Sequence, residues 1–381
     1  MTRLLPLLLL LALSTAVRAQ GFIEKVTDLL EFNLGKPVAD TTMFQNKIVL
    51  SPIAFYEPQT NFGFGVGAKL LFKPKRAQEL TRTSNIPLSA SYTLNGQFFF
   101  FSSYTVFFPE EKWLLRGNLE FRSFPQGYYG IGNGTTEDDR TEISFKQILV
   151  EPLLLRQVRK NLFIGGGFRY NRVYDTVLDV ATEELSEGMS LQDSLGSTSA
   201  GVELAAIYDS RDNVLNAQRG LLVEFTQGFY GMEVAGTNAF ELTKVDVRRY
   251  KSLGERNTLA FHAFGRHTWN NAPAQELSTL GGPTLLRGFQ EGRFRDRVAF
   301  FSQVEYRHQG RGRLGFVTFA GAGQVADRVG DLGLGDFRFS VGAGLRLLIV
   351  PSEALNLRLD YALGLGPSAD RNFYLGIAEA F

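Results

Sequence analysis

The side chains that could carry out chemistry are few in this sequence. It contains no cysteine, which excludes disulfide bonds, cysteine metal sites and thiol catalysis. Its three histidines, His262, His267 and His308, are too few for a histidine-rich metal site, and polar positions in a wall or loop are the simpler interpretation. No serine stands in a convincing arrangement with a histidine and an acid. We therefore expect no enzyme activity, no cofactor and no metal ion.

Two turn-like stretches combine charged residues with glycine. The run from Asp209 to Asn213, followed by Arg219 and Gly220, predicts a structural turn network at a rim of the fold. The run from Gly281 to Phe289 contains a single charged residue, Arg287. An arginine enclosed by a fold needs a carboxylate partner, because a desolvated charge without one is very costly.

The elements that must position these residues are β-strands. From Leu355 to Leu365, leucines and a tyrosine alternate with Asn, Arg, Asp, Ala and Gly, so one face is apolar and the other polar. Residues 337–347 and 62–72 repeat this period of two. Such strands are long enough to cross a bilayer, which takes roughly 9–11 tilted residues. A polar face of mixed Arg, Asp and Gly is typical of a wet barrel interior.

We therefore expect an all-β fold, a sixteen-stranded antiparallel transmembrane β-barrel with a short N-terminal helical segment. The bilayer demands a closed barrel, because no strand edge can face lipid unsatisfied. Most connections after even-numbered strands are short and the long ones follow odd-numbered strands, as expected for periplasmic turns and outer loops. The stretch 74–85 is an exception, because it is long, basic and nominally periplasmic. The predicted strands are 46–56, 61–73, 86–95, 97–108, 113–124, 140–157, 161–175, 198–210, 220–231, 239–253, 258–269, 297–309, 313–325, 337–350, 354–366 and 372–381.

The N-terminus predicts export from the cytoplasm. Arg3, the apolar run 4–13 and the small residues Ala16 and Ala19 predict a cleaved signal peptide over residues 1–19. The apolar run is too short to span a bilayer as a helix.

Residues 20–45 are expected to form a periplasmic segment ahead of a barrel domain of residues 46–381. Apolar residues from Phe22 to Leu30 fall on one helical face, and charged residues including Glu31 fall mostly elsewhere. This pattern predicts a short amphipathic helix followed by a linker. The helix would lie on the inner leaflet surface, dock under the barrel, or serve only as a tether.

The motif Leu286-Arg287-Gly288-Phe289 resembles the V/L-R-G-F/Y loop motif of the BamA/TamA (bacterial surface antigen) superfamily. Members fold as sixteen-stranded outer-membrane barrels and tuck this motif into the lumen after the eleventh strand, where the strand count also places Arg287. The stretch 209–220 and the ending with Tyr374 and Phe381 are similar to the family's turn and C-terminal barrel signal. Residues 20–45 are too few for a periplasmic POTRA domain, so we expect a short form that lacks these domains.

The resemblance also implies which residues hold the loop. The family's glutamate that faces the motif arginine matches Glu305, which alternation places on the lumen face, and we hypothesise an Arg287–Glu305 ion pair that pins the loop. The family's F-x-D-x-G motif matches Phe319, Gly321 and Gly323, with Gly321 in place of the aspartate. Glu305 is therefore the expected leading partner of Arg287.

The seam between the first and last strands is predicted to be weak. Pro52 in the first strand cannot donate a hydrogen bond to a ladder, and Gly376 in the last strand offers little side chain for packing. In the resembled family this seam opens sideways, so that client strands pair with its edge. We expect the same possibility here.

The resemblance implies a protein of the Gram-negative outer membrane that assists insertion or translocation of other proteins. Its expected partners are outer-membrane lipids and, if that function holds, unfolded outer-membrane clients and a periplasmic protein. The net charge of +1 gives no indication of nucleic-acid binding. The alternatives are a passive porin-like channel and a structural membrane anchor, and a membrane-embedded lipase is disfavoured because no catalytic set is visible.

Overall fold

Strand is the dominant conformation in the computed structural model, which describes residues 31–33, 44, 46–57, 61–76, 78–179, 196–231, 239–270, 272–366 and 370–381. Residues that alternate between apolar and polar fit a pleated strand, whose side chains point to opposite faces in turn. Within the described ranges, no helix is long and apolar enough to cross a membrane.

Sixteen long strands form the wall, which is the seventeen-stranded antiparallel sheet without its short strand β1. They are β2 (Lys47–Glu57), β3 (Asn61–Phe72), β4 (Ser84–Thr93), β5 (Phe98–Phe107), β6 (Trp113–Tyr128), β7 (Thr141–Arg159), β8 (Leu162–Asp179), β9 (Ser197–Asp209), β10 (Gly220–Tyr230), β11 (Phe240–Ser252), β12 (Asn257–Asn270), β15 (Val298–Gln309), β16 (Leu314–Ala326), β17 (Arg338–Val350), β18 (Leu355–Leu365) and β19 (Arg371–Ile377). Each coincides with one predicted segment to within a few residues.

The remaining elements are short and lie at the ends of the wall. They are β1 (Glu31–Asn33), β13 (Ser278–Leu280), β14 (Phe294–Asp296) and the 3-10 turns η1 (Gln78–Leu80), η2 (Pro109–Glu111), η3 (Ala274–Glu276), η4 (Val329–Asp331), η5 (Leu334–Asp336) and η6 (Pro351–Glu353). Strands β13 and β14 pair with each other as a separate hairpin within the β12–β15 connection.

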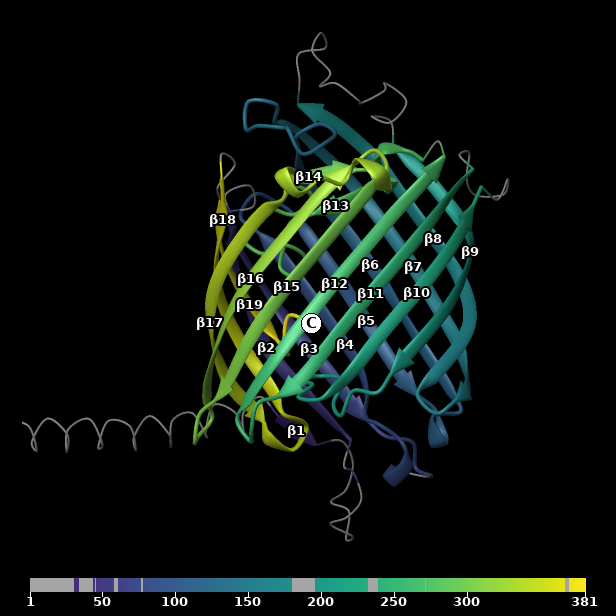
Figure 1. Cartoon of the computed structure of the whole chain (residues 1–381), viewed down its shortest axis with the longest axis vertical. Coiled ribbons are helices and arrows are strands. Elements are labelled where there is room, and N and C mark those ends of the chain that lie inside the picture. The colour runs from purple at the N-terminus through teal and green to yellow at the C-terminus, as the bar shows by residue number, and fades with distance from the viewer. Residues whose placement is uncertain are drawn as a thin grey trace, which may run out of the picture.

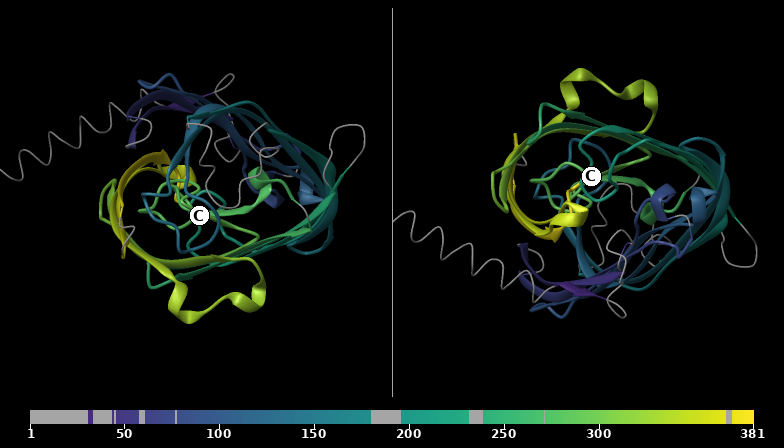
Figure 2. Two further views of the ribbon diagram at one scale, coloured as in Figure 1. Left: turned by 90° about the horizontal axis from the view of Figure 1, so that it is seen from above. Right: turned by 90° about the horizontal axis from the view of Figure 1, so that it is seen from below.

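The wall strands are tilted and curl around a central lumen (Figures 1 and 2). Consecutive wall strands pair along most of their length, whereas β19 meets β2 at one register pair, Phe373 with Tyr56. Figure 2 also shows loop segments and the C-terminus inside this lumen. The two ends of the sheet therefore come together, but through far less backbone pairing than elsewhere.

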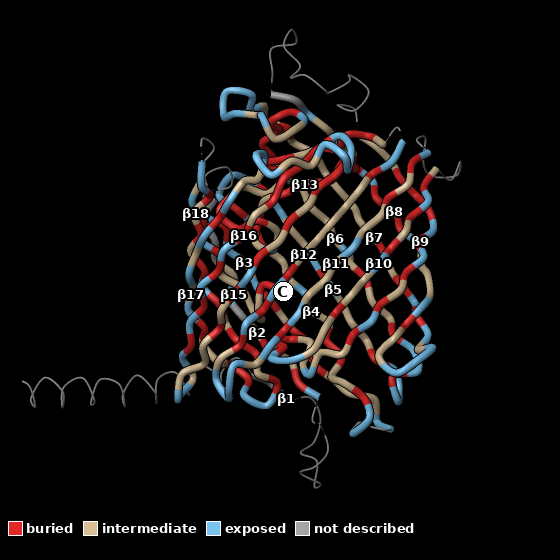
Figure 3. The backbone as a smooth tube through the Cα atoms, in the orientation of Figure 1, coloured by how far each residue is buried: buried red, intermediate tan, exposed pale blue. Residues whose placement is uncertain are grey.

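Alternation along each strand separates an outer from an inner face, as the banded colouring in Figure 3 shows. On β18, Leu359 is 45% exposed whereas its neighbour Asp360 is fully buried. On β15, Val304 is exposed while Glu305 is buried, which is the expected assignment of faces. The outer face is thus mainly apolar, as lipid contact requires.

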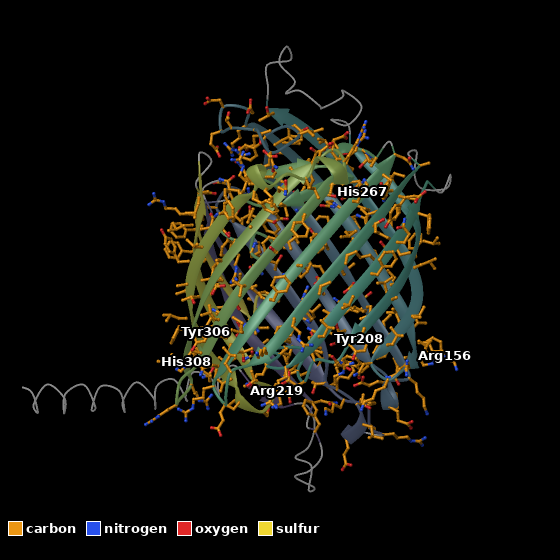
Figure 4. All side chains as sticks on the ribbon, in the orientation of Figure 1. Arg156, Tyr208, Arg219, His267, Tyr306 and His308 are labelled. Atoms are coloured by element: carbon orange, nitrogen blue, oxygen red, sulfur yellow. The ribbon has the colours of Figure 1, made fainter. Side chains whose placement is uncertain are left out.

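Aromatic side chains mark the two rims of the wall. Tyr208, Tyr306 and His308 lie near the lower rim, and His267 lies near the upper one (Figure 4). The ring of His267 also contacts Trp269, whose side chain is exposed. Amphipathic rings at these levels suit the two membrane–water interfaces.

The long basic turn between β3 and β4 is braced, not loose. It carries Arg82, whose guanidinium lies 2.8 Å from Glu111 of η2 and 3.0 Å from Asp209 of β9. Since all three side chains are largely buried, the turn is fixed to two neighbouring connections at the lower rim. This arrangement explains how an unusually long turn keeps a defined shape.

The prediction of a helix around Glu31 is wrong at that residue. Glu31–Asn33 form strand β1, in which Glu31 is in register with Val49 of β2. An exposed strand edge offers unpaired amides and carbonyls, and this local pairing outweighs the weak helical pattern. The signal peptide and the rest of the predicted helix lie outside the described residues.

The prediction that the last strand continues to Phe381 is also wrong. Strand β19 ends at Ile377, and Ala378 has a φ of 74°, which turns the chain into the lumen. There the ring of Phe381 stacks on His262, and its main-chain oxygen accepts a hydrogen bond of 3.0 Å from Arg307. Burial of an aromatic ring and satisfaction of a buried guanidinium favour this turn over four more residues of strand.

We call residues 378–381, which follow β19, the C-terminal tail. We expect Phe381→Ala to weaken docking of this tail by about 3 kcal/mol, because a buried ring is lost from a packed cluster. The measurement is the rate of carboxypeptidase digestion of the folded protein, which should rise markedly. Phe373→Ala is the matched control, because Phe373 is 52% exposed on the outer face. Equal digestion of the two variants would contradict the docked tail.

Candidate functional site

The connection between β12 and β15 enters the lumen and turns sharply at its tip. Gly281 and Gly288 have φ values of 113° and 103°, which residues other than glycine rarely adopt. A Cβ atom at Gly288 would lie 2.6 Å from the backbone nitrogen of Gly364 on β18. The loop therefore touches the barrel wall directly, and only glycine allows this approach. We call residues 281–289 the lumen loop.

Arg287 at the tip of the lumen loop is completely buried between two carboxylates. Its Nη2 lies 2.5 Å from Glu305 on β15, and its Nη1 lies 2.7 Å from Asp360 on β18. The ring of Phe319 on β16 stacks on the guanidinium, with its centroid 3.4 Å from Cζ. The arginine thus joins three strands of the wall to the loop.

The structure brings Arg287 and Glu305 together as hypothesised, but Glu305 is not the leading partner by itself. Asp360 is the second carboxylate and was missed as a partner, although alternation along β18 already placed it on the polar face. Gly321, at the family's aspartate position, lies beside Ser340 and Gln303 and has no acid to offer. The second carboxylate at this guanidinium therefore comes from β18, and not from the position of Gly321 on β16.

The other motif residues hold the lumen loop by packing. Leu286 and Phe289 are fully buried in an apolar cluster beneath the β13–β14 hairpin. Gly323 accommodates the neighbouring Leu280, since a Cβ there would lie 2.9 Å from that side chain. The hydroxyl of Tyr374 accepts a hydrogen bond of 3.2 Å from the amide of Gly288. Tyr374 therefore faces the lumen and fixes the loop to β19.

The ion pairs continue from the lumen loop to the C-terminal tail. Asp360 also binds Arg346 at 2.6 Å, and Arg346 binds Glu379 of the tail at 2.7 Å. Glu305 also binds Arg307 at 2.7 Å, the residue that donates to the oxygen of Phe381. The loop and the tail thus share one network of buried charges.

Both residues expected at the seam lie next to it. Pro52 is exposed on β2, between the register pairs that β2 makes with β1 and with β19. Gly376 lies on β19, where a Cβ would be 3.2 Å from Nε of Arg358. Few backbone pairs join β19 to β2, in keeping with the weak seam expected.

A third buried carboxylate, Glu276, anchors the β12–β15 connection ahead of the lumen loop. Glu276 of η3 receives hydrogen bonds of 3.0 and 2.9 Å from Arg169 and one of 2.8 Å from Asn171, both on β8. Burial opposes ionisation of Glu276, but the charges of Arg169 and Arg266 outweigh it, so its pKa lies below the ordinary 4.5.

The turn after β9 forms the predicted structural network. Asp209 binds Arg211 at 2.9 Å, and the amide of Arg219 donates to Asp212 at 3.2 Å. Asn213 donates to the backbone oxygen of Glu353 at 2.9 Å, so this turn crosses the lower end of the lumen to η6. Among the described residues, no group of three or more metal-ligating side chains is found.

Removing either carboxylate from Arg287 should loosen the lumen loop. We expect Glu305→Gln and Asp360→Asn each to cost about 3–5 kcal/mol, because a buried cation then lacks part of its compensation. Protease cleavage within the loop and urea unfolding of the refolded protein measure this. Asp327→Asn is the control, since Asp327 and its partner Arg297 are both about half exposed and should matter little. Unchanged cleavage in all three variants would contradict the arrangement.

The contacts of Glu276 with Arg169 and Asn171 should weaken at low pH, when the carboxylate becomes protonated. Because the pKa of Glu276 is lowered on folding, its contribution to stability is complete above 4.5 and is lost as the pH falls through the lower folded value. We expect protease sensitivity of the η3 region to rise below pH 4.5, and Glu276→Gln to be sensitive already at pH 7. A pH profile of the variant parallel to that of the original protein would argue against this role.

Comparison with known protein families gives a match over nearly the whole wall. Residues 56–381 match the Omp85 superfamily domain. A search of curated proteins finds no match. The matched range contains the lumen loop, its carboxylate partners and the C-terminal tail.

Solved structures give the same fold at low sequence identity. BamA from Haemophilus ducreyi lacking POTRA domains 1–3 has a TM-score of 0.54 and 13% identity, with 96% of this chain and 78% of that chain covered. CdiB from Acinetobacter baumannii gives 0.56 and 14%, with 87% and 59% covered. CdiB from Escherichia coli gives 0.57 and 12%, with 87% and 62% covered, so this chain spans less than two thirds of either CdiB. Its domain match covers most of the chain, and its fold agrees with that match. The protein therefore belongs to the Omp85 superfamily of outer-membrane β-barrels.

Proposed function

We propose that this protein assists the insertion or translocation of polypeptides at the outer membrane, through a closed barrel whose seam opens between β19 and β2. The observation that carries the proposal is the single register pair at this seam, beside a lumen loop that is held firmly by Arg287. A strand edge with few hydrogen bonds loses few of them when it exchanges its partner for an incoming strand.

The filled lumen favours this function over a passive channel. The lumen loop and the C-terminal tail both lie inside the wall, and their charged residues pair with the wall strands. One cavity among the described residues has a volume of about 370 Å³, and loop residue Leu285 and tail residue Ala380 both line it. A steady wide pore would require both segments to leave.

The periplasmic side would receive clients through a partner or the chain's own N-terminal segment. The turn around η1 extends beyond the lower end of the wall (Figure 1) and carries Leu80, which is 71% exposed. Since Arg82 braces this turn, it offers a fixed surface for a soluble partner.

Locking the seam with a disulfide bond should abolish the protein's assistance to client folding while leaving its own fold intact. The chain has no cysteine, so Tyr56→Cys with Phe373→Cys gives a disulfide only between these two register partners. We expect the oxidised double variant, in liposomes, to lose acceleration of client-barrel folding, and reductant to restore it. Phe339→Cys with Leu365→Cys is the matched control, a register pair between β17 and β18.

Two outcomes would contradict the proposal. One is undiminished acceleration by the locked seam variant. The other is a large, steady conductance in planar bilayers without any effect on client folding, which would favour a passive channel. A protein that shows neither activity would act as a structural anchor.

A further inference from the structure

A cavity near the upper end of the lumen separates the wall from the β12–β15 connection. Strands β6, β7 and β8 form one side of it, and the connection from η3 to Arg295 forms the other. Figure 1 shows β13 and β14 of this connection at the upper end of the wall. We call this space the upper cavity. Its volume of about 200 Å³ lies below the roughly 300–1,000 Å³ of typical ligand pockets, so only a small ligand fits.

The charged side chains that line the upper cavity do not balance. They are four arginines and three glutamates, namely Arg122, Arg169, Arg266, Arg295, Glu120, Glu276 and Glu291. Two of the glutamates belong to one arginine, because Arg122 forms ion pairs with Glu120 and, at 3.2 Å, with Glu291. One glutamate is therefore left for three arginines.

That glutamate, Glu276, is shared by two of the three. Arg169 donates two hydrogen bonds to it, and Arg266 lies 3.7 Å away. Arg169 also lies 3.2 Å from Glu151, but Glu151 lines a separate cavity, where Lys244 approaches it to 3.8 Å. No glutamate of the upper cavity remains for the fourth arginine.

The fourth arginine, Arg295, makes no ion pair with any residue that the structure describes. Its Nη1 donates a hydrogen bond of 3.0 Å to the backbone oxygen of Ala274, and its Nε is buried without a hydrogen-bond partner. The ring of Tyr128 lies 5.3 Å from its Cζ, a contact that compensates a guanidinium less than a carboxylate does. Because a guanidinium cannot lose its charge, an anion in the upper cavity would gain from this cation.

The wall of the upper cavity also carries apolar side chains, although the interior of such a barrel is usually polar. They are Ile143, Phe145 and Leu149 on β7 and Val173 on β8. Leu149 stands in register between Glu120 of β6 and Asn171 of β8, so it faces the lumen as they do. Phe145 and Leu149 remain partly exposed, so the connection does not cover them fully. The cavity thus joins an uncovered apolar surface to an unpaired cation.

We propose that the upper cavity binds a small organic anion, a carboxylate on a compact apolar body. The carboxylate pairs with the guanidinium of Arg295, which can hold both of its oxygens in one plane. The apolar body packs on Phe145 and Leu149 and removes their exposed surface from water. Because the cavity lies between the wall and the β12–β15 connection, a bound anion joins the two and strengthens docking of the connection.

The test measures thermal unfolding of the full chain in detergent, at constant ionic strength, with benzoate or benzamide added. Benzamide has the same ring as benzoate but no charge. We expect benzoate to raise the unfolding midpoint saturably and benzamide to leave it nearly unchanged. Arg295→Gln should weaken the affinity for benzoate about tenfold or more, because the carboxylate loses its cation. Leu149→Gln should weaken it about threefold or more, because part of the apolar surface is lost.

Arg297→Gln is the matched control and should respond as the original protein does, because Arg297 lies on the same connection but is 48% exposed and pairs with Asp327. Three results would overturn the site. They are no response of the original protein to benzoate, equal responses to benzoate and benzamide, and equal benzoate responses of the original protein and Arg295→Gln. The comparison of the two compounds needs only the original protein, so it decides the matter even if a variant fails to fold. None of these results depends on insertion or translocation activity, so the two proposals can fail separately.

Discussion

The buried guanidinium of Arg287 is the constraint around which the interior is organised. A desolvated cation inside a barrel is tolerable only when carboxylates reach it with good geometry. Glu305 and Asp360 do so from β15 and β18, which are separated by two strands of the sheet. Their placement requires that the strands between them have the correct tilt and register. The lumen loop can therefore pair with the wall only when the barrel has formed with the correct strand tilt and register.

The bilayer imposes the second constraint, and it acts on the outside of the same strands. Lipid cannot satisfy exposed backbone groups, so the wall must pair every strand along its length. The seam meets this requirement least. At this edge β2 makes one register pair with β19 and three with β1. The short strand β1 extends pairing at the lower part of this edge, which the last strand does not reach.

Much of this organisation could be predicted from alternation alone. Period-two patterns located all sixteen wall strands and the lumen face of Glu305, because side-chain direction in a strand depends only on position. Asp360 lay on a correctly assigned face, but alternation does not say which strands face each other across a lumen. The turn at Ala378 was unpredictable for a similar reason. Its cause is contact of Phe381 with His262 and Arg307, which are distant in sequence.

The shared network makes the seam and the lumen loop energetically dependent on each other. If β19 moves away from β2, the tail that follows it must either move as well or stay behind. Movement of the tail separates Glu379 from Arg346, and Arg346 then relies on Asp360 alone, the acid that also holds Arg287. A tail that stays behind must instead stretch the turn at Ala378. In both cases the cost of opening includes rearrangement of charges that secure the loop, and a rigid interior therefore limits how far a weak seam can separate.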